Sequence, residues 1–526
     1  MSMTRGMTRG MTRGRTRIAL AVACALPAAA RADEVAVGKQ AEAAPEVDLR
    51  LTLSSFVFRE GGGEAPPLVD MGAPIDSASP VRRYFGDLRL ELTGGGLELD
   101  GRVRQTTSER YQSGASAGGE YELRRLAYRI GAGDTRLIVG RQYIDAVGAT
   151  KVDGAAVIRK LSKVWSGTVF GGAFPALGSR SLDTDYPELR TADGTPGSAL
   201  VPLVGGAGAA YSTGNVHGDL GAAAVHVMQD VPDAPSPEAS RVYLAASGYA
   251  RMARWLDVYH FGLLDVAGAA GVQLTNGSVG VDARPTAATQ LSASVNHVGA
   301  DLLQVAARNV LVDPDPTAIG IVQNNIAVVR VSQDLVRGAA SVALARQRFE
   351  LSVSGTLQRR PGVTVALADG GAAAFPEARS ATATFGVVDR RSIAKLRVSA
   401  TATVVYPLGD ALPNRSRGSV VRLAASRAFA GARGELEADA MAERFRDLGG
   451  GGCMTSLEVL ACFGASSTSA AQLGALASWR VGREWLVLAD AHLGIRDVTS
   501  RSIDGTVDYP TATSVTGFAR VQWRYR

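Results

Sequence analysis

The end of the chain alternates strictly between apolar and polar side chains. The alternating segment consists of Ala519, Arg520, Val521, Gln522, Trp523, Arg524, Tyr525 and Arg526. Successive side chains of a β-strand point to opposite faces, so this segment predicts a strand with one apolar and one basic face. In a soluble sandwich the apolar face would pack on a second sheet. With Trp523 and Tyr525 on that face, the strand can instead close a barrel whose outside contacts lipid.

The same alternation recurs from Val47 onward. Residues 47–53 form one such segment, and residues 87–92 and 97–104 form two more, joined by Gly94, Gly95 and Gly96. Two alternating segments separated by a few glycines predict a β-hairpin. Further charged faces occur at residues 435–439 and 489–496. Charges in a soluble core would be costly without partners, whereas charges that face a water-filled lumen or bulk solvent are ordinary.

Short and long connections alternate along the chain. Predicted short turns include Gly131–Thr135, Ser212–Asn215, Asp334–Gly338, Ala430–Arg433 and Val481–Glu484. Predicted long connections include Thr106–Glu120, Pro175–Pro202, Asp301–Gly320, Asp447–Ser467 and Asp497–Ala512. This segregation is typical of membrane barrels, which have short periplasmic turns and long outer loops. The sequence therefore predicts an all-β, antiparallel up-and-down transmembrane barrel of about 22 strands (roughly 18–24), with Arg346–Arg348 taken as a bulge.

The large aromatic residues lie close to the predicted short turns or to the end of the chain. They are Trp165, Trp255, Trp479, Trp485, Trp523 and Tyr525. Amphipathic aromatic side chains gather at the two interfaces of a membrane barrel, at the ends of its strands. We therefore expect these residues to lie at one interface.

The first 32 residues predict a secretory signal peptide. They hold six arginines and no acidic residue, an apolar segment from Ile18 to Ala30, and a small-x-small cleavage site at Ala30–Ala32. Residues 33–46 then form a short periplasmic tail, and residues 47–526 the barrel. Without the leader's arginines, the 56 basic residues fall to the number of acidic ones, 50. A mature chain without net positive charge gives no support for nucleic-acid binding.

The chain has no apolar run near the ~18 residues that a membrane helix needs, so strands must do any spanning. The signal peptide, hairpins, loop segregation and aromatic strand ends resemble bacterial outer-membrane β-barrels of the porin-like kind over residues 47–526. Gly140-Arg141-Gln142 followed by Asp153-Gly154 resembles a hairpin of the alginate-export-type barrels. The resemblance implies an outer-membrane location, contact with outer-membrane lipid, and insertion by the barrel-assembly machinery. It does not extend to plugged receptors, because the tail is too short for a plug domain.

Residues suited to chemistry are sparse. Residues 114–118 match a nucleophile-elbow pattern without the strand–turn–helix context that it needs. The histidines are singly placed and lack metal-ligand spacing. We expect no metal, no cofactor and no enzyme activity. The favoured function is a channel for diffusion or export of small polar solutes. The alternatives are a structural or assembly barrel whose lumen is occluded, with Pro175–Pro202 as the segment that folds inward, and, less favoured, an outer-membrane hydrolase.

Two groups of residues carry specific expectations. Cys453 and Cys462 share one predicted outer loop, in a compartment where disulfides persist, and we expect them to be bonded. Strand alternation also predicts a set of charged residues that line the lumen, namely Asp87, Arg89, Glu91, Asp100, Arg102, Arg104, Glu435, Glu437, Asp439, Arg520 and Arg524. Closure would bring Arg520 and Arg524 near Arg50, several strands from the acidic group at 435–439. Since the mature net charge is zero, we expect weak charge selectivity and a polar solute.

Overall fold

The computed structural model describes most of the region predicted to form the barrel. The described residues are 47–61, 81–106, 119–176, 185–190, 196–230, 240–268, 271–299, 332–366, 372–375, 377–393, 396–409, 416–431, 433–447, 466–502 and 505–525. The predicted signal peptide and tail (1–46), the nucleophile-like segment 114–118, and the predicted disulfide between Cys453 and Cys462 lie outside them.

A single antiparallel sheet of 22 strands closes on itself. Its strands are β1 (Asp48–Gly61), β2 (Val81–Gly94), β3 (Leu97–Thr106), β4 (Gly119–Ala132), β5 (Thr135–Ile144), β6 (Thr150–Lys160), β7 (Trp165–Ala173), β10 (Leu203–Ser212), β11 (Val216–His226), β12 (Arg241–Ala253), β13 (Leu256–Ala267), β14 (Gln273–Thr286), β15 (Thr289–Val298), β16 (Gln333–Leu344), β17 (Phe349–Arg360), β20 (Ala378–Ile393), β21 (Leu396–Leu408), β22 (Ser416–Phe429), β23 (Gly434–Asp447), β24 (Ser466–Val481), β25 (Trp485–Ser502) and β26 (Gly505–Tyr525). Each strand pairs with its neighbours in the chain, and β1 also pairs with β26 from Leu49–Tyr525 to Gly61–Thr513. The predicted up-and-down barrel of about 22 strands is confirmed.

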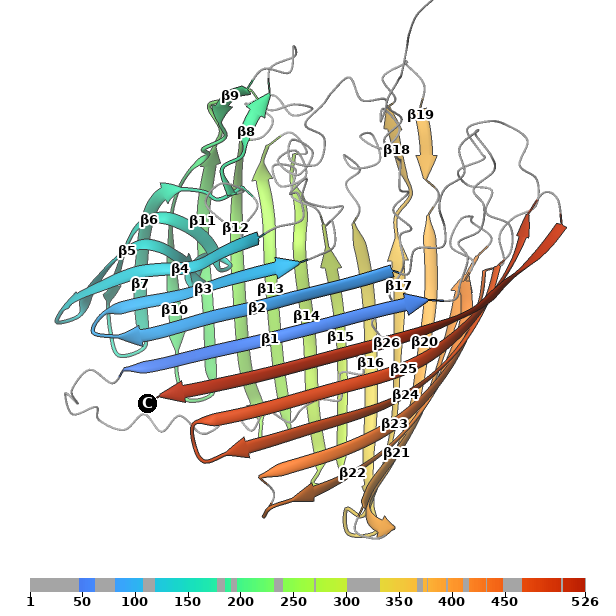
Figure 1. Ribbon diagram of the computed structural model, residues 1–526. Helices are drawn as coiled ribbons and strands as arrows, with labels where there is room; N and C mark the ends of the chain where they lie inside the picture. Colours follow the sequence, from blue (N-terminus) through green and yellow to red (C-terminus); the bar gives the residue numbers. More distant parts are fainter. Residues whose placement is uncertain are drawn as a thin grey trace, which may run out of the picture.

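The two rims of the barrel differ, as the connection lengths predicted. The strand ends that short turns join gather at the lower rim in Figure 1, and most strand ends at the upper rim are separated by longer stretches of sequence. Two small hairpins extend two of the upper connections. One is formed by β8 (Glu188–Arg190) and β9 (Pro196–Ala199), the other by β18 (Val363–Ala366) and β19 (Ala372–Phe375).

The predicted turn at Asp334–Gly338 is wrong, and so is the bulge at Arg346–Arg348. Residues 334–338 lie inside β16, and the chain turns between β16 and β17 instead. Ala345, Arg346 and Gln347 take positive φ angles of 48°, 56° and 67° there. Non-glycine residues seldom adopt this left-handed conformation. The turn therefore carries no glycine to mark it in the sequence.

The long loop predicted at Asp497–Ala512 is also wrong. These residues extend β25 and β26, which remain paired as far as Ser502 and Gly505. Asp, Gly and Pro in this stretch suggested a loop, but its β-branched residues fit a strand. The ladder shifts register between Arg496 and Val498, opposite Pro510, and such an irregularity tolerates a residue without an N–H.

The two faces of the wall have opposite character. On β23, β24 and β25, the side chains of Leu436, Leu473 and Leu493 are 55%, 66% and 63% exposed. Asp439 lies on the other face of β23 and is mostly buried, its side chain 7% exposed. Side chains on the concave face of a closed sheet crowd one another, whereas those on the convex face do not. The apolar face is therefore the outside of the barrel and the polar face its inside, the pattern of membrane barrels.

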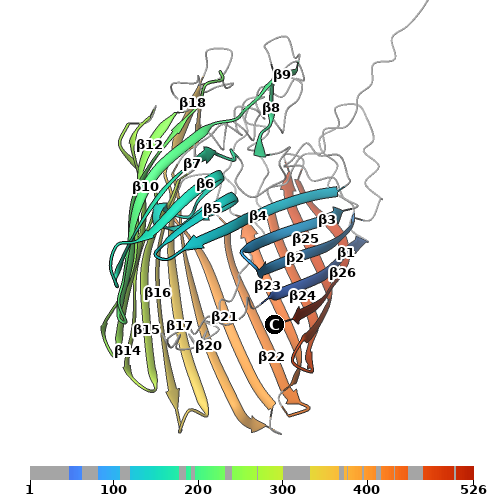
Figure 2. The same ribbon diagram turned by 90° about the vertical axis from the view of Figure 1, so that its left-hand side faces the viewer.

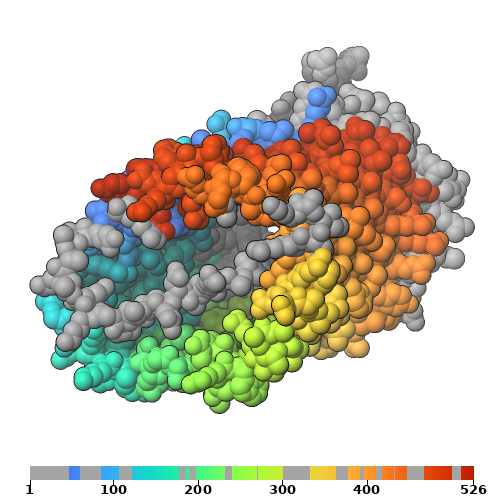
Figure 3. Space-filling model, turned by 90° about the horizontal axis from the view of Figure 1, so that it is seen from below, coloured from blue at the N-terminus to red at the C-terminus, as the bar shows by residue number. Residues whose placement is uncertain are grey.

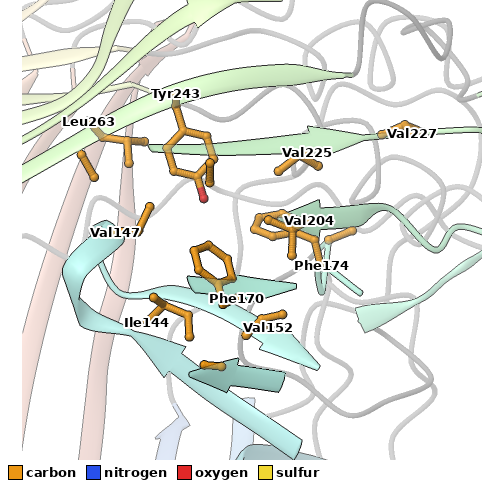
Figure 4. Close-up of a cluster of buried hydrophobic side chains, with 14 of the residues drawn as sticks. Ile144, Val147, Val152, Phe170, Phe174, Val204, Val225, Val227, Tyr243 and Leu263 are labelled. Carbon is orange, nitrogen blue, oxygen red and sulfur yellow. The ribbon is translucent and has the colours of Figure 1, made fainter. Parts of the chain in front are cut away.

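One end of the ring folds in on itself. The 3-10 helix η1 (Asp145–Val147) joins β5 to β6 and contacts β10, β11 and β12. In Figure 2, β5, β6 and β7 fill the corner between β4 and β10. Apolar side chains of η1 and β5–β7 point toward apolar side chains of β10–β13 (Figure 4). This inner hydrophobic cluster comprises Ile144, Val147, Val152, Ala156, Phe170, Phe174, Ala176, Leu200, Val204, Ala223, Val225, Val227, Tyr243, Ala245 and Leu263.

Two glycines allow this close approach. A Cβ atom at Gly221 would lie 2.5 Å from both the carbonyl oxygen of Ala146 and Cγ2 of Val147, and one at Gly208 would lie 2.8 Å from the same oxygen. Both distances are too short for a side chain, so η1 can rest on the wall only where these residues are glycine.

Seen from below, the ring is elongated, with β24–β26 and β1–β3 (red and blue) along one long side (Figure 3).

Candidate functional site: the interior of the barrel

Charged side chains on the inner face of β1–β4 form a continuous network of ion pairs. Antiparallel register sets Arg89 opposite Arg102 and Glu91 opposite Asp100, so unlike charges meet along the diagonals. Arg89 contacts Asp100 through two hydrogen bonds of 2.9 and 2.8 Å. Glu91 lies 3.2 Å from Arg89 and 3.4 Å from Arg50. Each of these four charges therefore has a counter-charge on a neighbouring strand.

The same network continues toward the upper and lower ends of these strands. Asp87 is buried and contacts both Arg102 and Arg104. Glu98, which is also buried, contacts Arg125 at 2.9 Å and Arg129. A pocket of about 320 Å³ lies at this network. Its charged lining residues are Arg89, Glu91, Glu98, Asp100, Arg124 and Arg125.

The closing seam brings the basic residues of β26 against β1, as predicted. Arg524 stands opposite Arg50 in the ladder, and Arg520 stands opposite Ser54. Arg524 donates a 3.0 Å hydrogen bond from Nε to Asp48, and Arg520 donates one of 3.2 Å to the Ser54 hydroxyl. The like charges at Arg50 and Arg524 are thus accommodated because each has its own carboxylate partner.

A second charged network lies on β22–β25. Arg422 donates to Glu437 at 2.9 Å and to Asp439 at 3.1 Å. His492 lies 2.7 Å from Asp490 and 4.0 Å from Asp439. The acidic group predicted at residues 435–439 therefore carries a counter-charge on the adjacent strand. The sequence predicted that the basic and acidic residues of the lumen lie several strands apart. Pairing of this kind weakens that separation of charge.

Between these networks the inner wall is rich in hydroxyl groups, a feature that the sequence analysis missed. It is formed by Ser292, Ser294, Ser341, Ser352, Ser354, Thr356, Ser380, Thr382, Thr384, Ser399, Thr401 and Thr403 on β15–β21. The register carries one face from strand to strand, as where Ser354 stands opposite Thr384 and Thr384 opposite Thr403. We call this set the hydroxyl arc. Its signal in the sequence is a Ser or Thr at every second position.

A buried ionic cluster fixes the inward-folded end of the ring. Pairing between β4 and β5 ends at Leu126–Arg141, which leaves the carbonyl of Leu123 without a strand partner on that side. The guanidinium of Arg141 donates to this carbonyl at 2.9 Å, to Asp153 at 2.6 Å and to Asp185 at 2.7 Å. Asp185 is fully buried. The cluster therefore ties the connection between β7 and β10 to the point where β5 leaves β4.

Two further side chains complete the buried ionic cluster. Lys151 lies 3.4 Å from Asp185, and the hydroxyl of Tyr186 donates to Asp153 at 2.7 Å. Burial, followed by the hydrogen bond to Asp153, raises the pKa of the Tyr186 phenol well above its ordinary value. Tyr186 therefore stays protonated and acts as a donor. Residues 140–142 and 153–154, which resemble a hairpin of the alginate-export-type barrels, lie at this cluster. Gly140 pairs with Gly154 and Arg141 with Asp153.

The predicted interface aromatics lie at the lower rim. Trp165 and Trp485 begin β7 and β25, Trp523 lies near the end of β26, and Tyr525 ends that strand. Trp523 lies 6.1 Å from Trp485 and 6.3 Å from Tyr525, measured between ring centroids. The two remaining tryptophans, Trp255 and Trp479, lie beside short turns, with side chains about half exposed.

Within the described ranges, no group of three or more His, Cys, Asp or Glu side chains could hold a metal ion. None of the helical segments in the described part of the chain is both long and apolar enough to cross a bilayer.

Comparison with known proteins gives matches in structure only. No family model and no curated protein matches the sequence. The chain is similar to OccK9 (OpdG) of Pseudomonas aeruginosa, with 12% identity, 91% of this chain and 99% of that chain covered, and a TM-score of 0.34. It is similar to OccD3 (OpdP) of the same species, with 10% identity, 92% of each chain covered, and a TM-score of 0.38. It is also similar to OccAB2 of Acinetobacter baumannii, with 9% identity, coverage of 91% and 98%, and a TM-score of 0.36.

The chain's own geometry defines its class. It is a closed antiparallel barrel of 22 strands with an apolar outer face and a polar inner face. This is the architecture of the porin-like outer-membrane barrels that the sequence resembles.

Proposed function

We propose that the protein is an outer-membrane channel through which small polar solutes cross by way of the barrel interior. The observation that supports this most directly is the contrast between the two faces of one closed wall. Apolar side chains such as Leu436 and Leu473 are exposed on the outside, and ion pairs and hydroxyl groups cover the inside. Only a wall with lipid on one side and water on the other stabilises both faces.

The orientation in the membrane follows from the rims. Short turns mark the periplasmic side of membrane barrels and long loops the outer side. The lower rim of Figure 1 is then periplasmic, and the aromatic group there, which includes Trp485 and Trp523, lies at the inner interface. Outer-membrane lipid is the partner of the exterior, and the barrel-assembly machinery inserts the chain.

We propose that the charged residues predicted from the sequence line the aqueous path. The ion pairs between neighbouring strands support this, as between Arg89 and Asp100 and between Arg422 and Asp439. Paired charges leave a small net field at a distance, so neither cations nor anions are strongly favoured. The charged networks and the hydroxyl arc together present donors and acceptors to a solute that is polar and carries little net charge.

The inward-folded end narrows the lumen and favours a second candidate, a barrel that is occluded and serves a structural role. A 22-stranded wall is wide enough that known examples enclose a plug. Here the inner hydrophobic cluster, including Val147 and Tyr243, fills one end of the elongated ring with the chain's own side chains. The two candidates differ in whether an open path remains beside this cluster.

Single-channel recording in planar bilayers separates the two candidates. The purified, folded barrel is expected to give discrete conductance steps with weak selectivity between potassium and chloride. A barrel that inserts, as shown by a gel mobility that changes on boiling, and yet gives no steps would be occluded. Such a result would contradict the proposed channel.

Selectivity tests the lining directly. Replacing Glu435, Glu437 and Asp439 together by Gln removes three negative charges. Two of these residues, Glu437 and Asp439, are ion-pair partners of Arg422. Each charge contributes roughly 0.6 kcal/mol at about 7 Å in water, reduced by half or more by salt. The permeability ratio should therefore shift toward anions by about two- to threefold. The matched control is Asp134→Asn in the lower-rim turn after β4, which should leave the ratio unchanged.

A further inference from the structure

The outer face of β22–β24 carries a compact group of polar side chains at the upper rim. The register places Arg417 opposite Arg446, and Arg446 opposite Ser467, in one row across the three strands. The row below it contains Ser419, Arg444 and Ser469. We call these six residues the rim donor patch.

The patch lies on the lipid-facing side of the wall. Val421 follows Ser419 on the same face of β22, and its side chain is 46% exposed, as is 54% of Leu423 two residues further on. On β24, Leu473 lies on the same face as Ser469 and is 66% exposed. The donors therefore sit directly above an apolar band, at the height where hydrocarbon gives way to headgroups in the proposed orientation.

The three arginines of the patch lack ion-pair partners among the described side chains. No carboxylate whose side chain the structure describes forms an ion pair with Arg417, Arg444 or Arg446. One carboxylate borders the patch. Asp497 stands opposite Ser469 on β25, with β24 between it and Arg444, and accepts a 2.6 Å hydrogen bond from Thr511. Directly opposed residues of an antiparallel pair have Cβ atoms about 5 Å apart, and like charges at this distance are unfavourable. Arg417 and Arg446 face each other in this way, and an anion bound between them would relieve the repulsion.

We propose that the rim donor patch binds the phosphate of a phosphorylated glycolipid in the outer leaflet. Guanidinium groups bind phosphate through paired hydrogen bonds, and the serine hydroxyls add further donors. The acyl chains of such a lipid would lie along the exposed Val421, Leu423 and Leu473. A free phosphate ion would gain the charge contacts without this apolar surface, so a lipid is the ligand that the whole patch fits. The proposal rests on the membrane orientation proposed above and is independent of conduction.

Binding of lipid A to the folded full-length barrel in detergent micelles tests the proposal. The wild-type protein is expected to bind diphosphorylated lipid A, and dephosphorylated lipid A at least about tenfold more weakly. The combined variant Arg417→Gln/Arg444→Gln/Arg446→Gln should bind diphosphorylated lipid A at least about tenfold more weakly than the wild type. The variant with Lys at the same three positions keeps the charge and loses the forked geometry of the guanidinium group. Its affinity for diphosphorylated lipid A should lie between those of the wild type and the triple Gln variant.

The control is Arg427→Gln, an exposed arginine at the lower end of β22, which should change the affinity less than about twofold. Equal affinity in the triple Gln variant and the wild type would overturn the proposal, as would equal affinity for the two forms of lipid A. Inorganic phosphate that competes at concentrations as low as lipid A itself would also overturn it, because the site would then be a simple anion site. Boiling-dependent gel mobility verifies folding of each variant, and bilayer conductance of the same variants tests the channel separately.

Discussion

Removal of the Arg141 guanidinium is expected to weaken the inward-folded end of the ring. The side chain of Arg141 is 3% exposed and that of Asp185 is 0% exposed. Arg141→Met keeps most of the volume and leaves Asp185 with Lys151 at 3.4 Å and Asp153 with Tyr186 at 2.7 Å. Removing one partner of a buried ion pair costs about 3–5 kcal/mol. Because Lys151 and Tyr186 compensate in part, we expect a loss near the lower limit, about 3 kcal/mol.

Urea titration of the barrel in micelles, followed by tryptophan fluorescence, measures this loss. The matched control is Arg129→Met on β4, whose side chain is 45% exposed where it contacts Glu98. An ion pair with one exposed partner contributes little, and the buried Glu98 keeps Arg125 at 2.9 Å, so the control should lose about 1 kcal/mol or less. Asp185→Asn, combined with Arg141→Met, closes a double-mutant cycle with an expected coupling of about 1 kcal/mol or more. A loss below about 1 kcal/mol for Arg141→Met, or a loss equal to that of the control, would refute the structural role of the cluster.

Three further predictions follow from single features of the chain. Gly221→Val should displace η1 from the wall, because its Cβ would lie 2.5 Å from Val147, and proteolysis of the 145–149 connection should become faster in that variant. Hydrogen bonds from Arg359 and Arg379 lower the pKa of Glu377 to about 2. Their favourable effect is present above the ordinary carboxyl pKa and is lost progressively as the pH falls from there through about 2, and an NMR titration midpoint near 4.5 would contradict this. Cys453 and Cys462 should resist a thiol reagent until they are reduced, and labelling of both without reduction would exclude the disulfide.

Local patterns in the sequence were sufficient to predict the class of fold. Alternation has a period of two wherever a strand separates unlike surroundings, so segments such as residues 97–104 and 519–525 could be recognised one at a time. Their pairing then follows from order in the chain, because up-and-down strands pair with their neighbours, and the pairing of β26 with β1 follows from closure. Turns with glycine, such as Gly94–Gly96, could be placed for the same local reason. The turn at Ala345–Gln347 could not, since its left-handed residues carry no such mark.

The inner face was predictable only in part. Alternation alone indicated that Arg89, Asp100 and Glu437 share the polar face, whereas their partners depend on register between strands. Register is a property of two strands together, and it sets Arg422 beside Glu437 and Asp439.

Tertiary structure alone decided that β5–β7 and η1 fold inward. Strands β5–β7 read in the sequence like any other part of the wall. The inner hydrophobic cluster joins Val147 to Tyr243, which lie far apart in the chain, and the approach depends on glycines at 208 and 221 that a sequence pattern cannot pair with η1. Alternation reports which face a residue occupies. The residue that it meets across the lumen is set by the curvature of the closed sheet, which no local pattern encodes.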